Sequence, residues 1–350
     1  MSVLASRAVR DQIPVLAERI VDNIYGRQSE PWRALGDVGR QKSVRDVGYH
    51  LTYLAEALNA DEAALFNEYL AWVKVLFAGL NFPASVLPDT LATIRLILSQ
   101  ALTAEVRHEV LAMLDNGQQG LEQVTTILPS FIRGDEPLDQ LARDFLEALL
   151  VGDRRRASEM ILASARGGVN IRDIYAQVFE RTQREVGRLW QINQISVAQE
   201  HFCTAATQMV ISQLYPYLFT GERKERRMVM TCVGGELHEI GARMVADFFE
   251  MDGWDTYFLG ANTPLEGVLR AVEEQQADLL AISVTMTYHL GHVSALIDGL
   301  RQWAGSQKPP VLVGGQPFNL SSQLWRKIGA DGYATDAQGA LRAAEQVMRK

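Results

Sequence analysis

A histidine and a glycine follow a carboxylate in the segment ELHEIG, residues 236–241. The apolar run 228–233 before it is typical of a buried strand, and the residues after it have the spacing of an amphipathic helix. Glu236 lies two residues before His238 and can accept one ring N–H, which leaves the other nitrogen free to bind a metal. A lone histidine in such a loop is more often a surface or capping residue. The surrounding sequence must therefore decide whether His238 is a metal ligand.

The context is an alternation of short apolar runs with helical patterns toward the C-terminus. This alternation predicts a flavodoxin-like, doubly wound parallel sheet that is buried on both faces. Ligands of such sheets bind at the carboxyl ends of the strands, where the strand order reverses. We expect His238 just past the first strand, at that place. The five expected strands are 228–233, 256–259, 279–284, 311–313 and 332–334.

Small residues end two further expected strands. Ser283 and Thr285 end the third, and the pair Gly314-Gly315 ends the fourth. Taken singly, the hydroxyls could bond to local backbone and the glycines could form a plain turn. Because the carboxyl ends of parallel strands share one edge, all three features are expected near His238.

Four helices are expected ahead of the sheet, at about 138–151, 157–166, 170–191 and 196–214. In the third, apolar residues recur at the spacing of one helix face. The fourth begins with Ser196 and Gln199 in a capping-box pattern, which satisfies exposed backbone donors. This part of the chain is predicted to be a four-helix bundle.

The pattern acid-x-His-x-x-Gly resembles the cobalamin-binding domain family. The resemblance implies that His238 is the lower ligand of cobalt, with Glu236 in place of the usual aspartate. It also implies that a base-off cobalamin sends its nucleotide tail into a cleft lined by small hydroxyl residues and a Gly-Gly pair. The residues it assigns to the cofactor in the sheet domain are Glu236, Leu237, Gly241, Ser283, Thr285, Gly314 and Gly315.

A second resemblance concerns the bundle. Trp190, followed after nine residues by Glu200 and His201, is similar to the signature of CarH-type cobalamin photoreceptors. It implies that Trp190 covers an adenosyl group and that Val197, Glu200 and His201 reach this group from the next helix. The alternative is a core tryptophan with polar residues capping a helix. Those photoreceptors carry a histidine after the tryptophan, whereas this chain has Gln191.

Length and composition indicate the class of protein and the number of domains. The chain has 350 residues, of which 47% are hydrophobic and 22% charged, as in globular proteins of two or three domains. No apolar run approaches the roughly 20 residues that span a bilayer, and no signal peptide is apparent. Two cysteines cannot form a disulfide framework, so we expect a cytoplasmic protein. Linkers at 129–137 and 221–226 predict domains at 1–130, 138–220 and 226–350.

Residues 1–130 are predicted to be almost entirely helical, with helices at about 7–24, 37–58, 61–80, 87–114 and 120–128. They contain 11 Lys and Arg against 15 Asp and Glu. A nucleic-acid module normally shows a basic stripe, so DNA binding is rejected.

Polar aromatic residues are concentrated in this N-terminal segment. Most such residues are core or interface. The alternative is a pocket for a second ligand, because a helical domain fused to a cobalamin core resembles the photocobilins, which pair cobalamin with biliverdin. No cysteine precedes Cys203, so a bilin here would be held without a thioether bond. The residues concerned are His50, Tyr53, Tyr69, Trp72, Lys74 and Phe77.

The favoured hypothesis is a light-sensing regulatory protein, not an enzyme, that binds adenosylcobalamin with a second chromophore, biliverdin, as an option. Photolysis of the cobalt–carbon bond would shift the bundle and a homo-oligomer interface and so signal to an effector protein, without nucleic acid or membrane. The alternative is a corrinoid methyl-carrier protein of a methyltransferase system, whose upper face must stay open. A cobalamin-sensing regulator indifferent to light is a third. His289 and His292 are expected at a helix start near the cofactor tail, and His108 in solvent.

Overall fold

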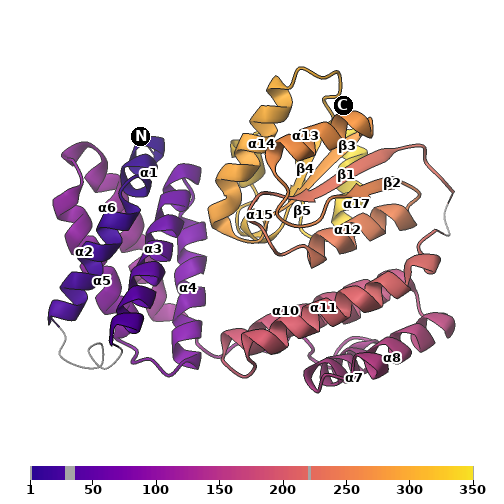
Figure 1. The fold of residues 1–350 in the computed structure, drawn as a ribbon, viewed down its shortest axis with the longest axis horizontal. Helices are drawn as coiled ribbons and strands as arrows, with labels where there is room; N and C mark the ends of the chain where they lie inside the picture. Colours follow the sequence, from indigo (N-terminus) through magenta and orange to yellow (C-terminus); the bar gives the residue numbers. More distant parts are fainter. Residues whose placement is uncertain (1, 28–35, 220–221, 350) are drawn as a thin grey trace. The chain divides into compact units, whose positions relative to one another are not determined.

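The computed structural model describes residues 2–27, 36–219 and 222–349, which fall into two compact units (Figure 1). The first comprises Met1–Thr126 together with Met286–Gly291 and Leu320–Lys327. The second comprises Ile127–Thr285, His292–Asn319 and Ile328–Lys350. Within the described ranges, no helix combines the length and the apolar character that a membrane crossing requires.

The first unit is helical, as predicted, but two expected helices are divided. The expected helix 7–24 is two helices, because Pro14 suits only a first helical turn. The expected helix 87–114 breaks at Thr103, whose extended backbone begins a new helix. In place of the expected helix 120–128, a 3₁₀ turn, η2 (Leu121–Gln123), forms. The helices are α1 (Ser2–Arg10), α2 (Ile13–Arg27), α3 (Gly36–Ala60), α4 (Ala63–Gly79), α5 (Val86–Ala101) and α6 (Ala104–Gly120).

The second unit begins with the predicted bundle. Its third helix is not uniform, because a π-helical stretch, η3 (Ile174–Phe179), interrupts it. The apolar face that the sequence indicated does form the core, with Tyr175, Val178 and Val186 buried. The α-helices are α7 (Asp139–Leu150), α8 (Arg154–Arg166), α9 (Ile171–Asp173), α10 (Glu180–Gln191) and α11 (Val197–Gln213), followed by the 3₁₀ turn η4 (Tyr215–Tyr217).

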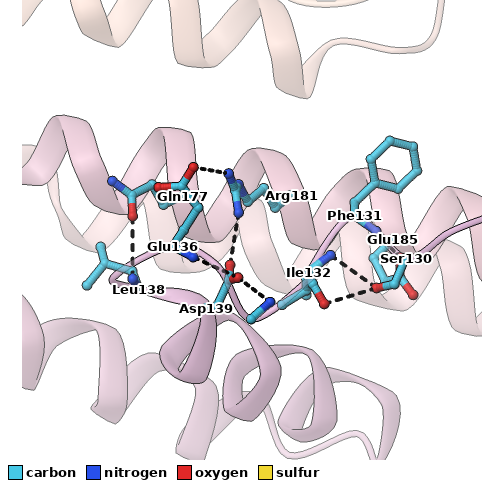
Figure 2. A network of polar contacts seen from close by, with 10 residues as sticks. Ser130, Phe131, Ile132, Glu136, Leu138, Asp139, Gln177, Arg181 and Glu185 are labelled. Carbon is cyan, nitrogen blue, oxygen red and sulfur yellow. Dashed lines mark hydrogen bonds and ion pairs between the residues drawn. The ribbon is translucent and has the colours of Figure 1, made fainter.

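The segment that leads into the bundle is tied to α10 by partly buried polar contacts (Figure 2). The Phe131 N–H donates to Glu185, and Asp139 accepts from the Gly134 N–H and from Arg181. Burial alone would raise the pKa of Glu185, but hydrogen bonds from Arg188 and Phe131 hold it below its ordinary value. The expected linker 129–137 is therefore packed on the helix that carries Trp190. Gly221, the first residue of the other expected linker, lies outside the described residues.

The predicted parallel sheet is confirmed. Its strand order is β2-β1-β3-β4-β5, all parallel, so the order reverses between β1 and β3. The strands are β1 (Arg227–Cys232), β2 (Asp255–Phe258), β3 (Leu279–Ser283), β4 (Val311–Gly314) and β5 (Gly332–Ala334). The helical elements between and after them are α12 (Ile240–Met251), α13 (Leu265–Glu274), the 3₁₀ turn η5 (Thr287–His289), α14 (Leu290–Gln302), α15 (Gln316–Leu320), α16 (Leu324–Lys327) and α17 (Ala337–Val347).

Helix α12 has two apolar faces. Ala242, Ala246 and Phe249 pack on the sheet, whereas Met244 and Phe248 belong to the core of the bundle. Both sets repeat every three to four residues, so they lie on different sides of one helix. The helix that follows His238 therefore joins the sheet domain to the bundle.

Candidate functional site

The loop that carries His238 leaves β1 at the place where the strand order reverses. It turns at Gly235, whose φ of +85° suits glycine. The Gly235 N–H donates to Asn262 Oδ1 at 2.7 Å, and the Asn262 N–H donates to the Glu236 carbonyl at 2.9 Å. The loop after β2 thus supports the loop after β1.

Glu236 orients the imidazole of His238. Its Oε1 lies 2.5 Å from His238 Nδ1 and accepts from the His238 backbone N–H at 3.0 Å, while Oε2 accepts from the Thr285 N–H at 2.8 Å. The Glu236 side chain is fully buried, whereas 56% of the His238 side chain is exposed. The hydrogen bond with Glu236 raises the pKa of His238 although desolvation opposes this. Nδ1 is thereby engaged, and Nε2 takes no part in the contact.

The small residues that the sequence singled out lie at neighbouring strand ends. Ser283 is paired in register with Cys232 and Gly314. A Cβ on Gly315, whose φ is +108°, would stand 1.9 Å from the Val284 carbonyl oxygen. Only glycine lets these two segments approach so closely. The carboxyl ends of β1, β3 and β4 therefore meet beside Glu236.

The bundle faces His238 through the first turns of α11. The capping box of Ser196 and Gln199 is present as predicted. Glu200 lies close enough to His238 for its negative charge to help raise the pKa of the imidazole. Val197 is 54% exposed, and His201, also exposed, contacts Glu200 Oε2 at 2.5 Å through Nδ1.

Trp190 and Gln191 lie at the end of α10. Trp190 is partly buried and packs against the apolar core of its own bundle, and Gln191 is buried. The position of Trp190 thus has a structural explanation that requires no ligand. Whether it also contacts a cofactor stays a prediction.

The site has the chemistry to receive a corrin ring. Leu237, beside the imidazole, is 72% exposed, and a Cβ on Gly241 would meet no atom within 4 Å. Among the described residues, no group of three or more His, Cys, Asp or Glu side chains is arranged to hold a metal ion. A single imidazole beside exposed apolar side chains fits a cofactor that supplies the other ligands of its own metal.

Sequence patterns alone did not single out four residues of this site. Gln208 of α11 donates to Glu239 Oε1 at 2.8 Å, the Ala261 N–H donates to Glu239 Oε2 at 2.8 Å, and Asn262 braces the loop. Only the adjacency of Glu239 to His238 could have drawn attention to one of them.

The other predicted histidines are at the expected places in the chain. His289 lies in the turn η5 and His292 in the first turn of α14, where its Nδ1 contacts the Gly234 carbonyl at 2.7 Å. His108 is exposed, as expected.

The N-terminal aromatic residues pack on one another. Tyr53 and Tyr69 are stacked with ring centroids 3.7 Å apart, and His50 Nδ1 contacts the Tyr69 hydroxyl at 2.7 Å. All three are buried. Trp72 is 38% exposed, and Lys74 donates to the Leu121 carbonyl. These contacts match the core alternative and give the predicted biliverdin no support.

Comparison with known families covers both parts of the second unit. A family model described as a B12 binding domain matches residues 226–342, and a second model of the same description matches residues 141–215. Over 117 residues the chain is 30% identical to dimethylamine corrinoid protein 3 of Methanosarcina mazei, which covers 33% of this chain and 68% of that protein. The chain belongs to the cobalamin-binding corrinoid protein family.

Two further relatives extend the likeness. Dimethylamine corrinoid protein 3 of Methanosarcina acetivorans is 24% identical over 213 residues, which are 60% of this chain and 98% of that protein. The structure of the Methanosarcina barkeri monomethylamine corrinoid protein superimposes with a TM-score of 0.52 and 23% identity. It covers 61% of this chain and 99% of that one, and it shows that the fold is shared.

These relatives overturn the predicted light sensor. They are corrinoid proteins named for methylamines, one of them related over nearly its whole length, and they favour the methyl-carrier alternative. The photoreceptor resemblance relied on the spacing of Trp190 and Glu200, which the packing of a bundle also explains. The predicted light-dependent oligomer interface depended on the light-sensor hypothesis and therefore has no support.

Proposed function

We propose that this chain is a corrinoid methyl-carrier protein that works with methyltransferases, and is not itself the catalyst. The observation that carries the proposal is the likeness to dimethylamine corrinoid proteins, together with a histidine loop built to present one imidazole nitrogen. When bound, a corrinoid would supply a cobalt centre that accepts and gives up a methyl group.

The residues of the chain would hold this group from two sides. His238 would bind cobalt from below through Nε2, because Glu236 engages Nδ1 and fixes the ring. Ser283, Thr285, Gly314 and Gly315 would line the path of the nucleotide tail at the carboxyl edge of the sheet.

The bundle would lie over the opposite face of the corrin. Val197 offers an exposed apolar contact, and Glu200 and His201 offer polar ones. Trp190, at the end of α10, is proposed to border the same face. A methyl group is small, so these side chains need not enclose it, and a partner enzyme must be able to reach it.

The test is to load the full chain with hydroxocobalamin, reduce it with titanium(III) citrate and add methyl iodide. We expect the visible spectrum of bound methylcobalamin, and methylcobalamin should bind at least as tightly as adenosylcobalamin. His238→Ala should weaken binding by about tenfold or more. A loaded chain that cannot be methylated, or that prefers adenosylcobalamin by more than about tenfold, would contradict the proposal.

A further inference from the structure

Glu239 follows His238 directly and is half-buried at the start of α12. Its Oε1 accepts from Gln208 Nε2 of α11, and its Oε2 accepts from the Ala261 N–H, both at 2.8 Å. One carboxylate therefore joins three elements, namely the His238 loop, the bundle and the loop after β2.

Neighbouring contacts extend this joint. Arg243, one turn after Glu239, donates to the Ser212 hydroxyl at 3.4 Å, and Ser212 lies one turn after Gln208. The equal spacing means that α11 runs alongside the first turn of α12. About two turns before Gln208, Glu200 acts electrostatically on His238.

The other links in this region are more deeply buried. Glu236 bonds to His238 and Thr285 in the sheet domain, and its side chain is inaccessible to water. Farther along α12, Tyr175 donates to Asp247 at 2.8 Å inside the bundle interface. The bond between Gln208 and Glu239 lies nearer to solvent, so both groups can exchange it for water at small cost.

We propose that Glu239 is a positioning residue, a clamp that holds the bundle against the His238 loop. Without the bond from Gln208, the His238 loop loses this tie to the bundle. Bundle position and the placement of His238 are thereby coupled. The consequence for cobalt rests on the proposed function, whereas the clamp itself can be tested without cofactor.

The first experiment is hydrogen–deuterium exchange of the cofactor-free full chain, read at the Ala261 amide and at the first turn of α12. Gln208→Glu places a carboxylate against Glu239 and should speed exchange about tenfold. Glu239→Gln alone should stay within about twofold of wild type, because the Gln208 amide can turn and accept from the new amide. Their combination restores both bonds, because the carboxylate introduced on α11 would accept from the amide introduced beside His238. Exchange in the double variant should therefore return to within about twofold of wild type.

Gln213→Glu is the matched control. Gln213 lies on the same helix and accepts from Ser158 within the bundle, and a glutamate there keeps this bond while adding the same charge. Its exchange should stay at the wild-type rate. Equal exchange in Gln208→Glu and Gln213→Glu, or a double variant that is not rescued, overturns the clamp.

The second experiment tests the coupling in the hydroxocobalamin-loaded chain, by following the rate at which cyanide replaces the upper ligand. Gln208→Glu should raise this rate about tenfold and Gln213→Glu should not. Faster exchange with an unchanged cyanide rate overturns the coupling. A chain that binds no hydroxocobalamin overturns the proposed function, while the exchange result on the clamp still stands.

Discussion

At the scale of single residues, the candidate site depends on the hydrogen bonds that the Glu236 carboxylate accepts. Its two oxygens accept hydrogen bonds from the ring and backbone of His238 and from the backbone of Thr285. A carboxylate can accept all three, because it has no proton of its own when ionised. An ionised carboxylate at this buried position therefore satisfies all of these donors.

Glu236→Gln tests this match. The amide nitrogen must face either His238 or Thr285, and a donor then meets a donor. We expect affinity for hydroxocobalamin to fall about tenfold to a hundredfold, as measured by absorbance titration. Glu266→Gln, an exposed acid at the start of α13, is the control and should bind normally. Wild-type affinity in Glu236→Gln would contradict the role given to the carboxylate.

At the scale of elements, α12 links the sheet to the bundle and carries a buried acid between them. Burial raises the pKa of Asp247 to about 6, although the bond from Tyr175 and the charge of Arg243 lower it. Tyr175 lies in η3, the π-helical stretch of the bundle. A charged group at this joint makes the contact between two elements sensitive to pH.

Proton binding by Asp247 sets the direction in which the stability of the fold changes with pH. Between about pH 4 and pH 6 folded Asp247 holds a proton that the unfolded chain has lost, so stability should fall as pH rises through this range. Asp247→Asn removes that dependence. Urea unfolding at pH 4.5, 5.5 and 7.5 should show a flatter profile, with the variant about 1–3 kcal/mol more stable at pH 7.5. Identical pH profiles would refute the assignment.

At the scale of the whole molecule, distant segments of sequence share one unit. The N-terminal helices hold residues 286–291, which follow β3, through the edge of Tyr288 on Tyr53, with ring centroids 5.5 Å apart. Ser321 donates to Glu62 at 2.7 Å, and Lys327 donates to the Asp61 carbonyl. The domain bounds 1–130, 138–220 and 226–350 stay predictions, since the first compact unit also includes these later segments.

Tyr288→Ala should weaken this unit by about 1–3 kcal/mol, because a half-buried ring and its edge-to-face contact are lost. The measurement is urea unfolding followed by circular dichroism. Tyr257→Ala is the matched control, since that ring is 47% exposed in the sheet domain and should cost less. Equal losses would mean that the contact with Tyr53 contributes nothing specific.

The amino-acid sequence by itself determined the elements and their order. Strand and helix periods are local properties, so the five strands, the bundle and the loop of His238 were predictable to within a few residues. The break at Thr103 and the π-helical stretch were not, because apolar spacing continues across both. The sequence pattern also favoured the wrong function, since a tryptophan at a given spacing serves a bundle core as well as a ligand.

Only the tertiary structure decided which distant groups meet. Thr285 is 49 residues from Glu236 and Gln208 is 31 residues from Glu239, yet both bonds form at 2.8 Å. Such pairs depend on strand order and on the packing of α12 between sheet and bundle. No local pattern encodes them, because the partners are brought together by burial of apolar faces that belong to other residues.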